Sequence, residues 1–405
     1  MTTEYVTGDS QQIRRINQEA ILRLVQQRGP ISRIEISEQL GLNPSTVNRL
    51  VDQLADSRLL WMDGEQSAGR QGGRPARLVR FNGDAACIAA VDLSNVPWRA
   101  ALVNLNGDVV ERFHAMPQPG DAEANLAVLA DLLDEIVAAG ERRHGSPLWG
   151  IGIGAPSIVL SQTGTVVWAA SLGWRDFPLK TWIEARWPVP VFVENDVNLL
   201  ALGESRLGAG QQAGNLVVMA VGTGIGAGII LNGRLYRGAS EAAGEIGYIP
   251  PNIAALGRSY TGYGPLEALA AAPGLVARAQ AALQDEVESL LVAADPLDAD
   301  AVYVAARSGD PVARQLVAET VDYLSLAVAA LAIVLNPELI LLGGEMAKAS
   351  DLLLSPIRER LAGLLPALPR LEPVCLGEDG VILGAVALVL QSTYADVAGL
   401  QVAWP

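Results

Sequence analysis

The start of the chain carries three helical patterns of apolar and polar residues in quick succession. Residues 11–28 repeat apolar side chains every three or four positions and stop at Gly29-Pro30. Residues 33–40 and 44–54 follow as two shorter helices. Short helices joined by a tight glycine turn are typical of a helix-turn-helix domain. The apolar positions expected in the first helix are Ile13, Ile16, Ala20, Ile21, Leu24 and Val25.

The ends of the second and third helices are marked by local signals. Ser32 and Glu35 have the spacing of a capping box, and Ile36 and Leu40 are expected to face inward before Gly41 stops the helix. Asn43 is placed to cap the third helix with Pro44 at its first position. The apolar stripe of this third helix is Val47, Leu50, Val51 and Leu54.

Two short strands, residues 59–62 and 78–81, flank the glycine-rich segment AGRQGGRPAR. Together with the helices they predict a winged helix-turn-helix. Residues 70–80 contain Arg70, Arg74, Arg77 and Arg80 and no acid. Glycine lets a backbone approach a duplex closely, and arginine in a narrow minor groove meets a strong negative potential. A basic linker between domains is the alternative interpretation.

The third helix is the expected recognition helix, with its N-terminal residues in the major groove of DNA. Asn48 can hydrogen-bond an adenine edge and Arg49 a guanine edge. A solvated helix face of no special role would have the same composition. The residues predicted to contact DNA are Ser45, Thr46, Asn48 and Arg49 in this helix and Arg70, Arg74 and Arg77 in the wing.

Residues 83–405 show a strand-turn-strand pattern with helices twice over. A strand at 88–92 and a hairpin turn at Asn106-Gly107 precede a helix at 123–140, and residues 215–236 repeat a strand, a glycine turn and a strand. We therefore expect an α/β body of two lobes with a cleft between them. The predicted domains are 1–82, 83–200 and 201–405, and a return of the C-terminal helix to the first lobe stays open.

Charge differs sharply between these parts of the chain. The net charge is −15, but residues 1–82 carry eleven arginines and nine acids, so the remaining residues carry −17. This asymmetry indicates a small nucleic-acid-binding module on an acidic body. Cys87 and Cys375 form no disulfide framework, which favours a reducing, cytoplasmic location. The apolar stretches are shorter than the ~20 residues of a membrane span, so no membrane is expected.

A polar cluster follows the buried strand at 191–195. The strand ends in Glu194-Asn195-Asp196, and a helix is expected to open at Asn198. Side chains at the carboxyl end of such a strand face the ligand side of an α/β sheet. Carboxylate and amide groups there are suited to sugar hydroxyls, while simple capping of the next helix is the alternative.

Several segments together resemble the ROK family of bacterial sugar-responsive repressors and sugar kinases. They are VENDVN, VGTGIGAGI, GEIGY followed by GYGPLE, and LLGGEMA, and the resemblance covers nearly the whole chain. It implies an actin-like ATPase fold for the body. The helix-turn-helix places the chain with the regulators of the family, which implies a homodimer, or a dimer of dimers, on a pseudo-palindromic double-stranded operator with a monosaccharide as effector.

The kinase signature of the family is incomplete in this chain. Its first phosphate motif, Asp-x-Gly-Gly-Thr, reads Asp92-Leu-Ser-Asn-Val here, without the glycines whose amides close on phosphate. The GTGIGAG segment at 222–228 remains, although packing alone can retain such a turn. Asp196 matches the position of the catalytic base. We expect no bound ATP and no kinase reaction.

The zinc motif of the family is replaced as well. Its histidine position is Tyr248 and its three cysteine positions are Arg258, Tyr260 and Pro265, none of which suits zinc. No zinc is expected. The loop would then depend on packing by Tyr248, Tyr260 and Tyr263.

The sugar positions implied by the resemblance are Asn195, Asp196, Glu245 and Glu267, with Tyr248 in place of the family histidine. Keeping sugar contacts without phosphate or metal residues predicts a binder, namely a repressor released by a bound monosaccharide. Two alternatives stay open: an active sugar kinase with a DNA module, and a DNA-binding scaffold whose pocket is vestigial.

Overall fold

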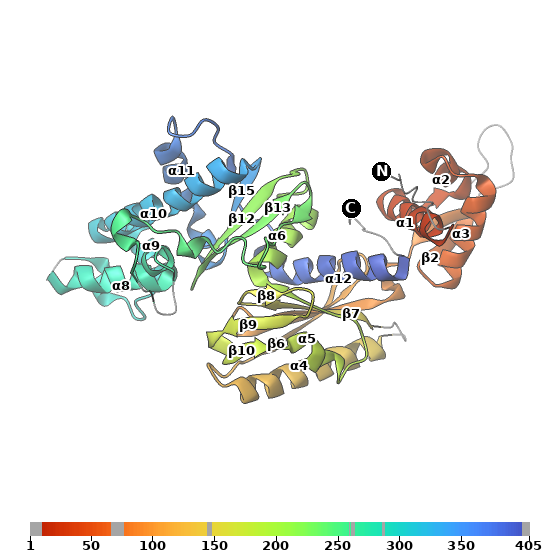
Figure 1. Cartoon of the computed structure of the whole chain (residues 1–405), viewed down its shortest axis with the longest axis horizontal. Coiled ribbons are helices and arrows are strands. Elements are labelled where there is room, and N and C mark those ends of the chain that lie inside the picture. Colours follow the sequence, from red (N-terminus) through yellow and green to blue (C-terminus); the bar gives the residue numbers. More distant parts are fainter. Residues whose placement is uncertain are drawn as a thin grey trace, which may run out of the picture. The chain divides into compact units, whose positions relative to one another are not determined.

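The computed structural model describes residues 10–65, 77–143, 148–258, 260, 264–285 and 288–398 of the 405-residue chain (Figure 1). The chain divides into two compact units. One comprises the residues up to Glu194 and from Ala385 onward, and the other comprises Asn195–Gly384. The predicted lobe boundary at residue 200 falls inside the helix Asp196–Leu207.

Three helices and a three-stranded sheet form the N-terminal domain, which confirms the predicted winged helix-turn-helix. In the sheet, β3 lies between β1 and β2 and runs antiparallel to both. The elements are α1 (Ser10–Arg28), β1 (Ile31–Ser32), α2 (Arg33–Leu40), α3 (Pro44–Asp56), β2 (Leu60–Glu65) and β3 (Arg77–Phe81).

The predicted end signals of α2 and α3 are confirmed. Ser32 and Glu35 form both hydrogen bonds of a capping box. Gly41 ends α2 in the left-handed conformation, with φ of 63°. The side chain of Asn43 accepts from the N–H of Ser45 at 3.0 Å, with Pro44 as the first helical residue. These local bonds fix where each helix begins and ends.

The core of the N-terminal domain is built from the expected faces of the three helices. Ile21 and Val25 from α1 pack with Ile36 and the stripe Val47, Leu50, Val51 and Leu54, all of them buried. The predicted helix over residues 11–28 is confirmed as α1. Ile13 and Ile16, near the start of this helix, are 54% and 48% exposed.

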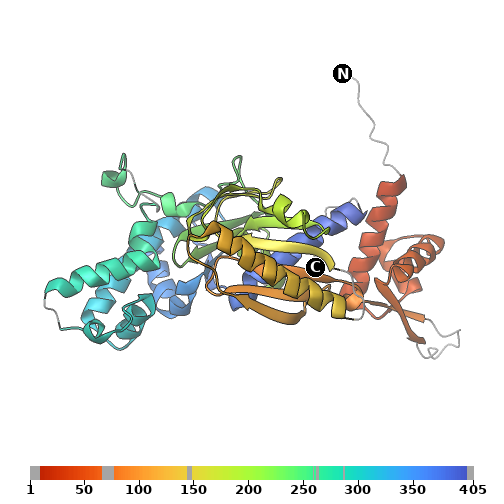
Figure 2. The same cartoon turned by 90° about the horizontal axis from the view of Figure 1, so that it is seen from below.

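The first lobe is a five-stranded sheet in the order β11-β7-β4-β5-β6, with β4 and β7 parallel. In β7, Ile151 and Ile153 are buried in the core shared with α4, whereas a methyl at Gly150 or Gly152 would meet α12. Alternation along β7 therefore places α4 and α12 on opposite faces, as Figures 1 and 2 show. The strands are β4 (Cys87–Asp92), β5 (Trp98–Asn104), β6 (Val109–Ala115), β7 (Leu148–Ala155) and β11 (Val191–Asn195), and the helices are α4 (Ala122–Arg142) and α12 (Gly380–Ala398).

A smaller sheet with the order β10-β9-β8 adds to the first lobe. Its Trp174 is buried and stacks on Phe177 with ring centroids 5.3 Å apart. The elements are β8 (Val159–Leu160), β9 (Thr165–Ala169), β10 (Trp174–Phe177) and α5 (Leu179–Glu184). These strands belong to the same hydrophobic core as α4.

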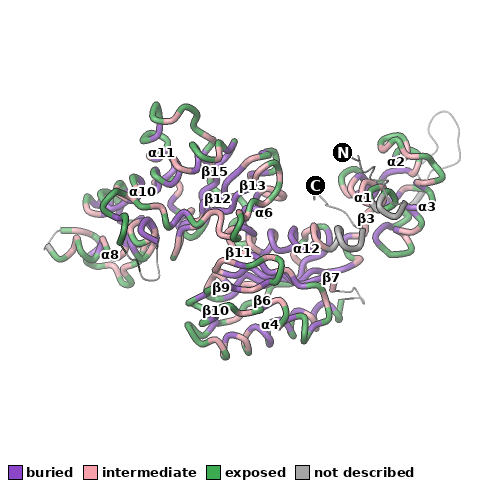
Figure 3. The backbone as a smooth tube through the Cα atoms, in the orientation of Figure 1, coloured by how far each residue is buried: buried purple, intermediate pink, exposed green. Residues whose placement is uncertain are grey.

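The second lobe repeats a five-stranded sheet, in the order β14-β13-β12-β15-β16. β12 and β13 form the predicted hairpin around a glycine turn, and β15 pairs in parallel with both β12 and β16. Figure 3 shows the central strands buried. The elements are β12 (Leu216–Val221), β13 (Ile225–Leu231), β14 (Arg234–Leu235), β15 (Leu339–Gly343), β16 (Arg370–Pro373), α6 (Asp196–Leu207), α7 (Glu267–Ala270), α8 (Ala272–Ala282), α9 (Ala299–Arg307), α10 (Pro311–Leu335) and α11 (Ser350–Leu361).

Among the described residues, α10 is the one helix long and apolar enough to cross a membrane by length and composition. This helix has 25 residues and is longer than the apolar stretch in its sequence. The difference arises because the helix begins at Pro311 and its first turns are polar. Leu324, Val328 and Leu331 are buried in the core of the second lobe. Half of its most apolar window is buried, as in the core helix of a globular lobe.

Candidate functional sites

The outer face of α3 presents the residues predicted to read DNA. Ser45, Asn48 and Arg49 are exposed and Thr46 is half-buried, while the buried residues of the stripe hold the opposite face. Within the described part of the chain, Arg49 makes no hydrogen bond or ion pair with protein. Its guanidinium group is therefore available for a ligand.

Asn48 is already engaged by a residue that the sequence interpretation missed. Arg33, the first residue of α2, donates from Nη1 to Oδ1 of Asn48 at 3.3 Å and to its main-chain oxygen at 3.4 Å. Its Nη2 binds Oδ1 of Asp52 at 2.5 Å and lies 3.6 Å from the sulfur of Met62. One arginine thus ties α2, α3 and β2 together. No sequence motif signals such a contact, because it joins residues brought together only by the fold.

Of the wing, only the two strands β2 and β3 lie within the described residues. Arg77 and Arg80 are exposed on β3, and Arg80 lies opposite Trp61, which is 59% exposed, in the antiparallel register. Arg70 and Arg74 lie outside the described residues. The described part of the wing thus exposes two arginines and a large aromatic side chain.

In the second lobe, α6 begins directly at the end of β11. The Oδ1 of Asn195 accepts from the N–H of Asn198 at 3.0 Å, and its Nδ2 donates to Oδ1 of Asp196 at 3.0 Å. The helix therefore opens at Asp196, two positions before the predicted start, because Asn195 is its cap. Asn195 performs the capping role weighed as the alternative, and it also orients the Asp196 carboxylate.

Two glycines leave room for the carboxylate of Glu267, the first residue of α7, and a third donates a hydrogen bond to it. A methyl group at Gly224 would lie 2.6 Å from its Oε1, and one at Gly247 would lie 3.0 Å from its Oε2. The N–H of Gly264 donates to Oε2 at 3.2 Å. The turn between β12 and β13 thus approaches Glu267 closely, and a larger residue at Gly224 would displace the carboxylate.

Glu245 and Glu267 are two carboxyl groups whose pKa values are both raised. Burial raises the pKa of Glu267, opposed by the N–H of Gly264. Desolvation by surrounding protein also raises the pKa of Glu245, and the nearby charge of Glu267 raises it further. Glu245 nevertheless remains exposed to solvent, so a ligand can reach it. Two neighbouring carboxylates that solvent can still reach are suited to accept hydrogen bonds from hydroxyl donors.

The expectation that tyrosines pack the former zinc loop is wrong for Tyr248 and Tyr260, which are 59% and 36% exposed. Tyr263 lies outside the described residues. The loop is held by main-chain contacts instead, since the N–H of Leu266 donates to the oxygen of Gly247 at 3.0 Å. Arg258 is exposed and Pro265 is buried. The described residues contain no cluster of three or more His, Cys, Asp or Glu that could hold a metal.

Asp92, at the end of β4, is fully buried and bound by its own loop. Its Oδ1 accepts from the N–H and the hydroxyl of Ser94 at 2.9 and 2.5 Å, and its Oδ2 accepts from Nδ2 of Asn95 at 2.8 Å. The glycines of GTGIGAG also have packing roles, because a methyl at Gly226 would lie 3.3 Å from Cγ2 of Val197 on α6.

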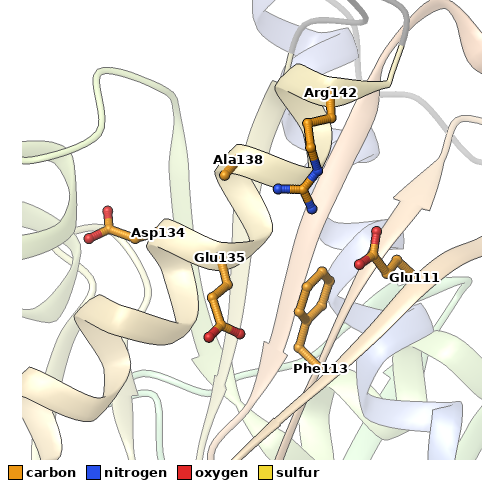
Figure 4. A pocket seen from close by; sticks show the side chains of 6 residues that line it. All are labelled: Glu111, Phe113, Asp134, Glu135, Ala138 and Arg142. Atoms are coloured by element: carbon orange, nitrogen blue, oxygen red, sulfur yellow. The ribbon is translucent and has the colours of Figure 1, made fainter.

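A hollow of about 510 Å³ opens between α4 and β6 of the first lobe (Figure 4). None of the predicted site residues lines it. Asp134 forms an ion pair with Arg186. The residues that line the hollow are Glu111, Phe113, Asp134, Glu135, Ala138 and Arg142.

Comparisons with known families match both parts of the chain. The ROK family model matches residues 88–392, and a model described as winged helix-turn-helix DNA-binding matches residues 14–60. The xylose repressor of Caldicellulosiruptor bescii is 30% identical over 391 residues, which are 95% of this chain and 97% of that protein. The glucokinase of Halalkalibacterium halodurans is 37% identical over 316 residues, which are 74% of this chain and 94% of that protein.

Solved structures divide in the same way. The crystal structure of a ROK family transcriptional regulator, a homolog of the E. coli MLC protein, matches with a TM-score of 0.83 at 27% identity and covers 96% of this chain and 99% of that one. A ROK family glucokinase from Streptomyces griseus, in complex with glucose and AMPPNP, has a TM-score of 0.64 at 29% identity and covers 76% and 100%. This solved regulator and the Caldicellulosiruptor repressor therefore match nearly the whole chain, whereas the two kinases match about three quarters of it.

Proposed function

Because the chain belongs to the ROK family, we propose that it is a sugar-responsive, DNA-binding transcriptional repressor. The observation that carries this proposal is the joining of a winged helix-turn-helix to a ROK body whose Glu245–Glu267 pair remains accessible. Full-length agreement with a xylose repressor and with a solved ROK regulator supports it.

DNA binding is assigned to the outer face of α3 and to the wing. Ser45, Thr46, Asn48 and Arg49 would contact base edges and phosphates in the major groove. Arg70, Arg74 and Arg77 would hold the wing on the neighbouring backbone. Because the net charge outside residues 1–82 is −17, contact is expected to be confined to this domain.

Sugar binding is assigned to Asn195, Asp196, Glu245 and Glu267, with Tyr248 at the rim. The carboxylates accept hydrogen bonds from hydroxyl groups, and the Tyr248 hydroxyl can both donate and accept. Binding would favour one arrangement of the protein and weaken its hold on DNA, with a coupling of about 1–3 kcal/mol. The relatives named xylose repressors make pentoses the first ligands to test.

A melting screen over pentoses, hexoses and their amino and phosphorylated forms tests sugar binding. A ligand at one hundred times its Kd should stabilise the protein by about 2.7 kcal/mol. Footprinting on DNA upstream of carbohydrate genes should reveal a discrete protected site that the same sugar clears. A flat melting response with normal DNA binding would instead favour the scaffold with a vestigial pocket.

The absence of kinase activity is part of this proposal. Ser94 and Asn95 donate three hydrogen bonds to the Asp92 carboxylate. Because these donors are used within the loop, we infer that the loop does not bind phosphate. On the same ground we expect no bound ATP. We also expect no zinc, since Tyr248, Arg258, Tyr260 and Pro265 supply no suitable ligand set.

A second candidate function is ATP-dependent sugar phosphorylation, which the retained Asp196 and the glucokinase relatives favour. An ADP-release assay over the sugar panel separates the two. Turnover that disappears in Asp196→Asn would establish the enzyme. We expect no ADP release above the protein-free rate.

The repressor is proposed to act as a homodimer, or a dimer of dimers, on a pseudo-palindromic operator with half-sites about one helical turn apart or a multiple of it. On α10, the side chains Leu326, Ile333 and Val334 lie at helical spacing and are 44%, 64% and 78% exposed. No charged residue occurs from Tyr323 to Pro337. This face of α10 can pack against the same face of a second chain. The negative charge of the body would repel a second chain elsewhere, but this face carries none.

Light scattering at several protein concentrations tests this assignment. Ile333→Asp should convert dimers to monomers and reduce affinity for a full operator. Ile253→Asp, at a loop position that is 88% exposed, is the matched control and should stay dimeric. An unchanged dimer in the first variant would exclude α10 as the contact.

A cytoplasmic location is proposed as well. Cys87 and Cys375 are both free, with Cys87 buried and Cys375 exposed. Thiols in this state fit a reducing compartment, where the operator DNA is also found. Fractionation of cells that express the full chain tests this proposal.

A further inference from the structure

Asn48 is the residue of α3 whose chemistry is most altered by its surroundings. A free asparagine amide offers an oxygen that accepts and a nitrogen that donates, and both are needed for the paired contact with N6 and N7 of adenine. Here the amide oxygen already accepts from Nη1 of Arg33 at 3.3 Å. Because a guanidinium group has donors only, the amide oxygen and not the amide nitrogen must face it.

Arg33 is itself held in place by several partners. Its Nη2 binds Asp52 at 2.5 Å, and Nη1 also reaches the main-chain oxygen of Asn48 at 3.4 Å. Its side chain is only 25% exposed, although it sits on an exposed face of the domain. Asn48 and Asp52 are one turn apart on α3, so a single planar group spans both.

We propose that Arg33 is a specificity-determining positioning residue for DNA recognition, and that it makes Asn48 a donor that selects guanine over adenine. The contact uses one lone pair of the amide oxygen and turns that oxygen toward Arg33, so the amide N–H groups of Asn48 point away from Arg33 and are the groups presented to a base edge. Guanine offers two acceptors in the major groove, N7 and O6, whereas adenine offers N7 beside the N6 donor. The inference rests on the proposed DNA binding and specifies how one position of the operator is read.

Asp52 adds a second effect of Arg33 that the experiment must separate from the first. The Arg33–Asp52 pair is neutral as a unit, so removing Arg33 alone leaves a carboxylate near the phosphates and weakens binding to every sequence. Removing both residues keeps the net charge of the face and still frees the Asn48 oxygen. The double variant therefore isolates the positioning effect.

The experiment is selection of bound sequences from random duplexes by the full-length protein and its variants. Asn48→Ala identifies the position that Asn48 reads, as the one whose preference disappears. At that position the unmodified protein should select guanine. Arg33→Ala and Arg33→Ala/Asp52→Ala should both shift the ratio of adenine to guanine by roughly tenfold toward adenine. Melting of each variant checks that the domain remains folded.

Arg28→Ala is the matched control, because Arg28 is an exposed arginine at the end of α1 in the same domain. It should lower affinity slightly and leave every base preference unchanged. Adenine selected by the unmodified protein, no position that depends on Asn48, or an unchanged motif in the double variant would each overturn the inference. If no sequence at all is enriched, the proposed DNA binding itself fails.

Discussion

Asp92 and Glu267 are two carboxylates at turns where the family places ligands, and their surroundings differ in kind. Asp92 is fully buried and accepts three hydrogen bonds from Ser94 and Asn95. Glu267 is half-buried, accepts one main-chain N–H, and has a pKa raised by burial. The first carboxylate stabilises its own loop, whereas the second retains acceptor capacity. The availability of its oxygens, and not the acid itself, distinguishes the carboxylate that stabilises its own loop from the one proposed to bind a ligand.

The largest expected effect is the loss of sugar response in Glu267→Ala. The unmodified protein should gain about 2.7 kcal/mol in unfolding free energy from a sugar at one hundred times its Kd, and the variant should gain almost nothing. Melting with and without sugar measures both. A full response in the variant would remove Glu267 from the site.

The opposite pattern is expected for Asp92→Ala. Loss of the buried carboxylate leaves its donors without partners and should reduce the unfolding free energy by about 2 kcal/mol. The stabilisation by sugar should remain. Chemical denaturation measures the first effect, and Asp92→Asn, which keeps one acceptor oxygen for Ser94, should lose less. A carboxylate whose removal costs no stability would contradict the structural role.

Gly224→Ala tests the close approach of the glycine turn to Glu267. The added methyl would lie 2.6 Å from Oε1 and must displace the carboxylate, so sugar affinity should fall by roughly tenfold, or about 1.4 kcal/mol. Calorimetric titration measures the affinity. Gly214→Ala is the control, since its methyl would meet Oε1 of Glu338 only at an ordinary 3.5 Å. Equal sugar affinities in Gly224→Ala and Gly214→Ala would show that sugar binding does not depend on the space beside the Glu267 carboxylate.

The smallest expected effect is on pH dependence. A carboxyl whose pKa is raised in the folded state stabilises the protein fully below its ordinary value of 4.5, and this contribution is lost as pH rises through the raised value. Glu267→Gln cannot titrate, so at neutral pH it should be slightly more stable than the unmodified protein. The difference should vanish near pH 4. A difference that grows on acidification would reverse the sign assigned here.

The sequence predicted the N-terminal domain nearly residue by residue because its signals are local. The capping box at Ser32, the left-handed Gly41 and the Asn43 cap each depend on neighbours within a few positions. The same local logic explains the start of α6, where Asn195 is the cap and the expected opening at Asn198 was two residues late. The Asx-type turn of Asp92 with Ser94 was also within reach of the sequence.

Contacts between distant segments were not predictable from the sequence. Arg33 reaches Asn48 and Asp52 only after α2 and α3 pack together, and the space around Glu267 depends on glycines from two separate segments. Composition misled the interpretation of the former zinc loop. Aromatic residues there indicated packing, yet Tyr248 and Tyr260 are exposed, because main-chain hydrogen bonds hold the loop.

The most direct test is fluorescence anisotropy of a labelled operator duplex, taken from the selection experiment, titrated with xylose and the other pentoses. The unmodified protein should bind the duplex at low nanomolar to micromolar concentration, as specific DNA-binding proteins do, and one sugar should release it. Glu267→Gln should bind the same duplex and keep it at every sugar concentration. Binding that no sugar alters, or release by the sugar from both proteins alike, would contradict a regulator whose DNA binding is controlled by sugar at Glu267.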